Sequence, residues 1–394
     1  MKIENIYIGG WFQRTMLQLT EIYDFLRNCE SRLKLDKAKL KRLHDALEIE
    51  SIEYATAGLE YLIFETKVGI SIKIYEDGLI VLNDKKSNKD TLFDDLKGLE
   101  TYYEKKLSPA LNYLFSLGAP VPKELAGIKT VYPYFIVFNN AKEEDISKLI
   151  EGADRKKYYE FSDDNVYILR GDQYYFINNK KKKSLPIERY VEEQIFIREF
   201  KGQLHHYLNL HRTIWERIAD VKENAKIKGK DIIKYSNKID GYEKTINLVD
   251  TRINQMGTYL RTREKIAKSD KELSEFLGVM GYRYETLADT LSYMQDLWDM
   301  TQNYVKQAKS LFKDLQGEVT EKSLSSLTIV TSMGVGASLL GYFDATSWPS
   351  ISGFGIAYFF ILALIGWAVS TIMGTIKKRR TYEVSDIEYD KNIK

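Results

Sequence analysis

The chain has 394 residues, of which 29% are charged, and its mean hydropathy is −0.36. This composition excludes a largely membrane-embedded protein, and the length allows two or three domains. The formal net charge of +2 indicates no particular class of partner, and we expect no direct binding of nucleic acid. Cys29 is the only cysteine, which excludes an intrachain disulfide. No apolar run of signal-peptide type follows Met1.

Residues 1–185 predict a cytoplasmic domain of the α/β or α+β class. Alternation on both sides of the Asp77-Gly78 turn predicts a β-hairpin or meander. Helical spacing over 89–117 ends before Pro120 and Pro122. The other expected elements are strands at 6–8, 61–64, 131–138, 157–161, 166–169 and 174–177, and helices between 15 and 47 and at 143–151.

The pattern of residues 186–270 predicts a helical hairpin, which belongs to the stalk region together with the long helix that follows it. One helix is expected over 187–227, and a second follows over 231–267 after a break at Gly229. Ser269 and Asp270 suit the start of a third helix. We therefore expect two antiparallel helices that lie against the top of that third helix.

Residues 271–322 predict a long coiled-coil stalk helix without proline. Its apolar positions alternate in steps of three and four, and Thr301 is the plainly polar exception. A repeat of 3.5 residues produces one apolar seam, which requires partner helices. The seam consists of Leu277, Met280, Tyr284, Leu287, Leu291, Met294, Trp298, Thr301, Val305, Ala308, Phe312, Leu315 and Val319.

Residues 323–376 predict a two-span transmembrane hairpin. Uncharged runs at 324–343 and 354–375 are each long enough to cross a bilayer, for which about 20 residues suffice. The basic residues 377–380 predict that this end is cytoplasmic. Two spans return the chain to one side, so both termini and the basic tail 377–394 are expected in the cytoplasm, with the hairpin in the cell (inner) membrane.

This order of parts resembles the CorA family of divalent-cation channels. The resemblance implies a homopentamer in which the first span lines the pore. The family carries Gly-Met-Asn at the outer end of that span, where this chain has Gly341, Tyr342 and Phe343. Phenylalanine offers no oxygen to a hydrated cation, so we expect the magnesium filter to be absent.

Divergent CorA-like proteins found with type III CRISPR systems lack the same signature. The resemblance to them implies an antiviral membrane effector, gated when its cytoplasmic part binds an S-adenosylmethionine–AMP adduct. The expected partners are then further copies of the chain, the lipid bilayer and this nucleotide messenger. We expect no resident cofactor, with Mg²⁺ as a second candidate ligand. A divergent divalent-cation channel and a structural scaffold remain alternatives; no enzyme motif is present, and we expect no enzyme.

The candidate site residues fall into three groups. The family pattern implies a pore-lining stripe of Ser323, Leu327, Thr331, Gly334, Ser338 and Gly341, although small residues also serve close helix packing. Tyr342, Phe343 and Asp344 would form the outer mouth, or an interface belt with a solvated charge. Tyr174, Tyr175, Lys181 and Lys182 suit nucleotide binding, or simply the end of a hairpin. The spacing of His205, His206 and His211 fits no metal site.

Overall fold

The computed structural model describes most of the chain, and the chain forms two compact units. The first unit contains residues 1–207 and 251–295, and the second contains 208–250 and 296–394. The first unit therefore combines a sheet with the ends of three long helices, beyond the expected boundary at 185. The described residues are 2–11, 19–56, 58–85, 90–114, 133–153, 156–180, 186–223, 226–269, 273, 277–343 and part of 361–383.

The first unit is built on a nine-stranded sheet with the order β2-β3-β4-β5-β1-β6-β9-β8-β7. All neighbours are antiparallel except β6 and β9, which are parallel. The strands are β1 (Ile3–Trp11), β2 (Ile49–Ala55), β3 (Tyr61–Thr66), β4 (Ile70–Tyr75), β5 (Leu79–Asp84), β6 (Tyr134–Asn139), β7 (Lys157–Ser162), β8 (Val166–Gly171) and β9 (Tyr174–Asn179).

The meander predicted around Asp77 is confirmed. Gly78 has φ +92° and its N–H donates to the Tyr75 carbonyl at 2.9 Å, which closes the turn between β4 and β5. Glycine adopts this left-handed conformation without steric cost, so the Asp-Gly pair fixes the register of the hairpin. Strand β2 was not predicted, because three of its seven side chains are polar and interrupt any apolar run.

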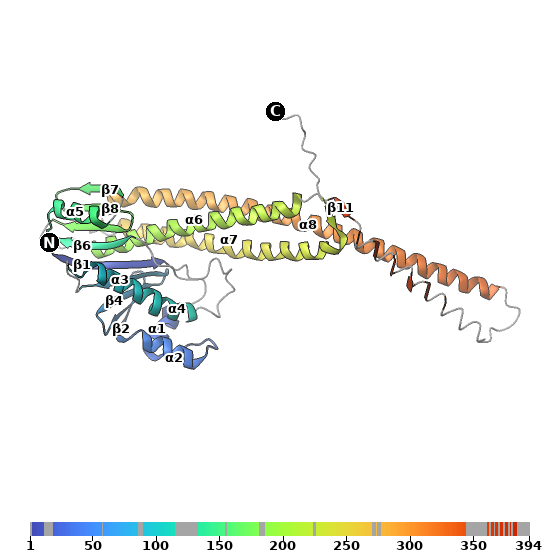
Figure 1. The fold of residues 1–394 in the computed structure, drawn as a ribbon, viewed down its shortest axis with the longest axis horizontal. Helices are drawn as coiled ribbons and strands as arrows, with labels where there is room; N and C mark the ends of the chain where they lie inside the picture. Colours follow the sequence, from blue (N-terminus) through green and yellow to red (C-terminus); the bar gives the residue numbers. More distant parts are fainter. Residues whose placement is uncertain are drawn as a thin grey trace, which may run out of the picture. The chain divides into compact units, whose positions relative to one another are not determined.

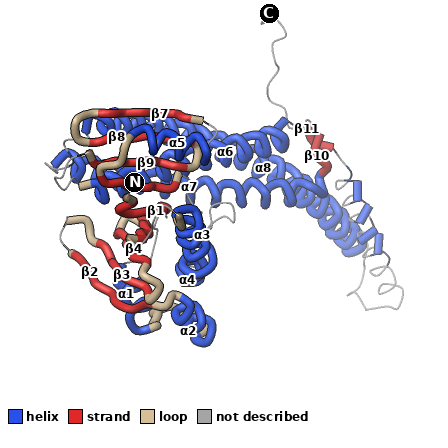
Figure 2. The backbone as a smooth tube through the Cα atoms, turned by 60° about the vertical axis from the view of Figure 1, so that its left-hand side comes forward, coloured by secondary structure: helices blue, strands red, loops and turns tan. Residues whose placement is uncertain are grey.

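Short helices cover one face of this sheet (Figure 2). The core on this face contains Ile6 and Ile8 of β1 and the apolar sides of these helices. The segment expected as one or two helices between 15 and 47 forms two, and the segment 89–117 contains a π-helical turn at Tyr103–Leu107. The helices are α1 (Leu19–Asn28), α2 (Lys37–Ala46), α3 (Leu92–Tyr102), α4 (Ser108–Leu114) and α5 (Glu143–Ala153).

Three long helices follow: α6 (Ile187–Glu223), α7 (Ile232–Ser269) and α8 (Leu277–Phe343). Their residues in the first unit contact the other face of the sheet. Trp11 of β1 stacks on Phe200 of α6 with ring centroids 5.5 Å apart, and the side chain of Ile195 lies over Gly9. Within the first unit, the segments of these three helices run side by side (Figure 1).

The predicted apolar seam of the stalk is buried from Tyr284 to Phe312, and Leu315 is partly exposed. Its nine positions from Tyr284 to Phe312 are each at most 5% exposed, and Thr301 donates its hydroxyl to the Leu297 carbonyl at 2.8 Å. The partner helices belong to the same chain. In the first unit Gln295 donates to Asn254, and in the second Gln302 donates to Asn247, both at 3.0 Å. These pairs place α7 antiparallel to α8.

Two details correct the sequence prediction. Helix α6 ends at Glu223, so the predicted end at 227 is wrong; β10 (Lys226–Lys228) and a 3₁₀ turn (Gly229–Asp231) precede α7. Strand β10 pairs with β11 (Thr381–Glu383), which lies in the predicted basic tail. In the part of the chain that the structure describes, we find no helix with the length and apolar character needed to cross a membrane.

Candidate functional site

A buried ion-pair cluster joins the sheet to two helices in the first unit. Arg263 of α7 donates from Nε to Asp77 Oδ2 at 2.5 Å and from Nη2 to Asp77 Oδ1 at 3.2 Å. Its Nη1 donates to Glu193 Oε1 of α6 at 2.9 Å. The side chains of Arg263 and Asp77 are each 2% exposed, so these charges interact where water screens them least.

The turn between β4 and β5 holds Asp77 in place for this interaction. Trp11 donates its indole N–H to the Asp77 carbonyl at 2.7 Å, and Leu79 donates its backbone N–H to Asp77 Oδ1 at 3.1 Å. The guanidinium of Arg263 lies over the rings of Tyr75 and Phe196, 4.8 and 4.9 Å from their centroids. Such cation–π contacts stabilise a guanidinium that has lost its water.

The N-terminal part of α8 joins the same cluster through Tyr284, which donates its hydroxyl to the second carboxylate oxygen of Glu193. Burial, and then the charge of Glu193, raise the pKa of Tyr284 well above its ordinary value, so the hydroxyl keeps its proton. Burial alone would lower the pKa of Arg263, but Asp77 and Glu193 outweigh it and raise this pKa. The cluster therefore holds one cation and two carboxylates, with a neutral phenol as the last donor.

A second polar group fixes the first turns of α6 on β4. Lys73 forms ion pairs with Glu188 at 2.5 Å and with Glu192 at 3.1 Å, and Tyr75 donates its hydroxyl to Glu192 at 2.7 Å. Burial lowers the pKa of Lys73, but Glu192 and Glu188 outweigh this effect, so the pKa is raised and the lysine is charged. Glu188, Glu192 and Glu193 of α6 are thus paired with cations of the sheet and of α7.

This arrangement suits mechanical coupling better than catalysis, because the charged groups are paired and shielded from solvent. Only a movement of α6, α7 or α8 relative to the sheet would separate them. Sequence reasoning missed the cluster, although one signal was present. Arg263 falls in the apolar seam of α7, in step with Met256, Leu260 and Ala267, where a charge requires a buried partner.

The structure separates the residues predicted to bind a nucleotide. Tyr175 is 1% exposed, stacks on Phe135 at 4.9 Å and hydrogen-bonds the Tyr190 hydroxyl at 2.8 Å. Tyr174 points to the opposite face of the sheet, where its ring lies 5.5 Å from that of Tyr134. The two tyrosines therefore share no site, and the ring of Tyr175 is enclosed by protein. Lys181 and Lys182 lie outside the described residues.

The predicted pore-lining residues all lie on the backbone of α8: Ser323, Leu327, Thr331, Gly334, Ser338 and Gly341. Steps of three and four place them along one side of the helix. Two residues of this stripe have a described exposure: Thr331 is exposed, and Gly334 is partly exposed. Tyr342 and Phe343 are the last residues of α8, and Asp344 lies outside the described residues. The structure thus places these residues along one side of α8, without showing which surface that side contacts.

The three histidines of α6 do not come together. His205 is exposed, His206 is partly buried, and His211 is buried against Trp215 and Trp298, with ring centroids 5.9 Å from both. Within the described ranges, no three His, Cys, Asp or Glu side chains are grouped so that they could hold a metal ion.

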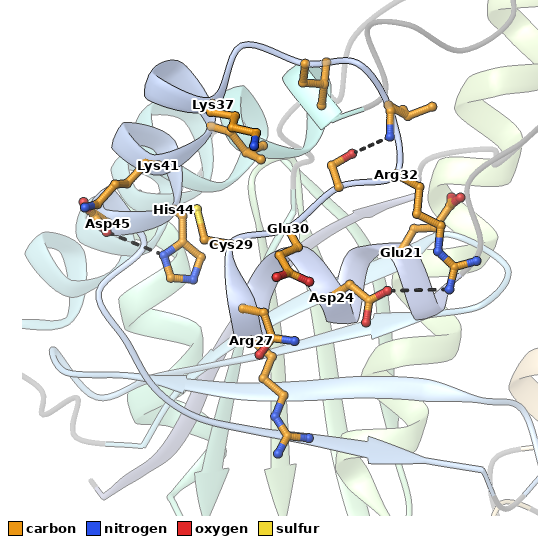
Figure 3. A pocket seen from close by; sticks show the side chains of 15 residues that line it. Glu21, Asp24, Arg27, Cys29, Glu30, Arg32, Lys37, Lys41, His44 and Asp45 are labelled. Atoms are coloured by element: carbon orange, nitrogen blue, oxygen red, sulfur yellow. Dashed lines mark hydrogen bonds and ion pairs between the residues drawn. The ribbon is translucent and has the colours of Figure 1, made fainter.

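A cavity of about 760 Å³ lies between α1 and α2 (Figure 3). Its charged groups are partly paired, since Arg32 contacts Asp24 at 3.8 Å. Burial, and then the charge of Asp45, raise the pKa of the Cys29 thiol, which disfavours the nucleophilic thiolate. The cavity therefore offers no activated nucleophile and no excess of one charge that would select a ligand.

Comparison with known proteins gives limited information. No protein-family model and no curated protein matches the chain. Among solved structures, the chain is similar to the CorA magnesium transporter from Methanocaldococcus jannaschii. The identity is 10%, the match covers 64% of this chain and 94% of that chain, and the TM-score is 0.30. A likeness at this level does not assign the chain to a family; the architecture established here is a mixed α/β N-terminal domain with long helices.

Proposed function

We propose that the chain is a CorA-like membrane effector of a type III CRISPR antiviral system. In this proposal a homopentamer lies in the cell membrane with both termini in the cytoplasm. The sheet unit binds a nucleotide messenger, the S-adenosylmethionine–AMP adduct, without turning it over. Binding then perturbs the membrane through the two predicted spans, at 324–343 and 354–375.

One observation carries this proposal. Helix α8 is unbroken over 67 residues from Leu277 to Phe343, which corresponds to about 100 Å at 1.5 Å per residue. Near its beginning, Tyr284 belongs to the buried cluster beside the sheet. Its last twenty residues or so coincide with the first predicted span. A displacement at the cluster therefore has one continuous element along which it can reach that span.

The ligand must prefer one of two arrangements of the helices, because only a difference in affinity shifts an equilibrium. Glu193 is the natural centre of such a change, since it holds Arg263 of α7 and Tyr284 of α8 at once. Rotation of α6 would move Glu193 and so change its contacts with Arg263 and Tyr284 at the same time. In the membrane, Tyr342 and Phe343 would then act as an aromatic constriction that the open state widens.

A divergent divalent-cation channel with an altered filter is the second candidate. The hydroxyl-and-glycine stripe through Thr331 and Gly334 favours it, since such a stripe suits a hydrated lumen. Phe343 argues against magnesium selectivity, because it stands where an oxygen ligand would be needed. In this alternative Mg²⁺ moves without any nucleotide.

Calorimetry on the purified, detergent-solubilised full-length protein separates the two functions. The adduct, Mg²⁺ and cyclic oligoadenylates are titrated separately. We expect saturable binding of the adduct and none of the cyclic oligoadenylates. Binding of Mg²⁺ with no response to any nucleotide would reject the effector function and leave the cation channel.

A further inference from the structure

Three arginines from distant parts of the sequence lie near one another in the first unit, on the face of the sheet that α6 and α8 cover. They are Arg170 of β8, Arg198 of α6 and Arg283 near the beginning of α8. The strand register determines what surrounds Arg170, which lies directly between Tyr159 of β7 and Tyr175 of β9. Directly opposed residues point to the same face of a sheet, so these three side chains form one row.

Helix α6 provides the other side of this site. Tyr190, Gln194 and Arg198 follow one another at steps of four and share one face of the helix. Tyr190 hydrogen-bonds Tyr175 in the row, which brings this helix face over β8 and β9. Arg283 donates from Nη1 to the side-chain oxygen of Gln194. Arg283 is thereby bound to a neutral amide, and its charge and that of Arg198 act on Arg170.

No carboxylate compensates these arginines within the described residues. Two acidic residues adjoin this face in the α6 sequence. Glu193 is already bound to Arg263 and Tyr284, and Glu199 accepts a hydrogen bond from the Trp11 backbone N–H at 3.4 Å. Burial lowers the pKa of Arg170 most, and repulsion from Arg198 and Arg283 lowers it further. Arginine nevertheless keeps its proton in proteins, so the repulsion persists and raises the free energy of the empty site.

Two donors at this site also lack an acceptor. Arg170 Nε and Gln194 Nε2 are buried and have no hydrogen-bond partner in the described structure. Gln194 is 3% exposed, so its amide is shielded from bulk solvent. Buried donors without acceptors are rare in folded proteins because each one costs free energy. A site with three cations and two unused N–H groups selects a ligand that is an anion and a multiple acceptor.

We propose that Arg170, Arg198, Arg283 and Gln194 bind the phosphate group of a small nucleotide-like ligand. Guanidinium groups match phosphate oxygens in geometry as well as charge. Tyr159 lies beside Arg170 and is partly exposed, so its ring is available to stack on the base. The arginines are partly buried between a strand and two helices, which suits one small oxyanion rather than a polymer. The assignment of this ligand as the messenger rests on the function proposed above.

The test uses the full-length protein in detergent, with calorimetry and thermal unfolding as readouts. The probes are the S-adenosylmethionine–AMP adduct, AMP, inorganic phosphate, and S-adenosylmethionine, which lacks phosphate. Arg170→Gln and Arg283→Gln each remove one charge from the site. Arg42→Gln is the matched control, because Arg42 is an exposed arginine of α2.

We expect phosphate-bearing probes to bind the wild type, and S-adenosylmethionine to bind at least tenfold more weakly than the adduct. Each site variant should weaken the phosphate-bearing probes by roughly 10- to 100-fold, the loss of one charge-assisted hydrogen bond, while Arg42→Gln should not. Without ligand, Arg170→Gln should melt no lower than the wild type, because repulsion is relieved. A role in folding alone would instead lower the melting temperature.

The remaining outcomes separate this site from the proposed function. Undiminished binding of the adduct by both site variants would overturn the site and leave the effector function standing. Binding of AMP and phosphate through the arginines, without any binding of the adduct, would support the site and reject the proposed messenger. If no phosphate-bearing probe binds the wild type, the site is refuted.

Discussion

Arg263 and Asp77 lie 186 residues apart in the sequence and form a buried ion pair with Nε 2.5 Å from Oδ2. The pair connects a β-turn of the sheet to α7, and Glu193 extends the connection to α6. The sheet and the helices of the first unit are therefore joined by charges as well as by apolar packing. Breaking this junction is the most direct way to test how firmly it is held.

Arg263→Met should lower the free energy of unfolding by roughly 3–5 kcal/mol, because it leaves Asp77 and Glu193 buried without a counter-charge. Denaturant unfolding of the full-length protein, followed by tryptophan fluorescence, measures the loss. Lys268→Gln is the control, since its ion pair with Glu264 is exposed and should contribute little. A loss of less than about 1 kcal/mol for Arg263→Met would contradict a strong buried junction.

Gly9 of β1 is a position where any side chain meets backbone. A Cβ atom there would lie 2.5 Å from the Ile80 carbonyl oxygen and 3.1 Å from two side-chain carbons of Ile195. Gly9→Ala should destabilise the protein by about 1–3 kcal/mol through this overpacking. Gly98→Ala in α3 meets no atom within 4 Å and should stabilise it by roughly 0.5–1 kcal/mol. Equal melting temperatures for the two variants would show that Ile80 and Ile195 do not lie as close to Gly9 as the structure places them.

Trp298 of α8 is fully buried, and its Nε1 has no hydrogen-bond partner in the described structure. Trp298→Phe removes this unsatisfied donor, which offsets part of the lost volume, so we expect a change within about 1.5 kcal/mol. Trp298→Ala leaves a cavity and should cost about 3–5 kcal/mol. Unfolding curves of both variants test the difference; a phenylalanine variant as unstable as the alanine variant would show that the indole N–H has a partner.

His211 makes the second unit sensitive to acid. Burial, and then the charge of Arg212, lower the pKa of His211 below its ordinary value, and neither ring nitrogen has a partner in the described structure. Protonation therefore favours the unfolded chain. The effect of His211 on the free energy of unfolding should be absent above about pH 6.5, the ordinary histidine pKa. Below that pH the free energy of unfolding should decrease, until the pH reaches the lower pKa of His211 in the folded state.

Melting temperatures at pH 7.5 and 5.5 measure this effect. His211→Phe should show a smaller decrease between the two pH values than the wild type does. His205→Gln, at an exposed position of the same helix, should keep the wild-type decrease. An unchanged decrease in His211→Phe would assign the acid sensitivity to other groups.

The stalk shows what the sequence could predict. The seam that contains Trp298 and Thr301 is buried as expected, because helical spacing is a local property of the chain. The sequence also predicted eight of the nine strands, including the meander at Asp77. It did not predict the pairing of β10 with β11, since register between distant strands leaves no local pattern.

The sites were less predictable than the elements. Basic and aromatic residues near Tyr175 suggested a nucleotide site there, but that ring is enclosed by Phe135 and Tyr190. The arginines that do converge come from β8, α6 and α8, and none stands out in its own segment. Only the fold brings Arg170 within reach of Arg283, because the sheet register and the packing of α6 together set their separation.

Release of a trapped dye from liposomes that contain the full-length protein tests the central claim, that α8 transmits ligand binding to the membrane. Lys313 is exposed on α8, beyond the buried seam position Phe312. Lys313→Pro interrupts the helix at a cost of about 3 kcal/mol or more, whereas Lys313→Ala leaves it intact. We predict that the adduct releases dye from liposomes with wild type and Lys313→Ala, and that Lys313→Pro binds the adduct but releases none. Equal release by all three proteins, or no release from the wild type, would contradict the account.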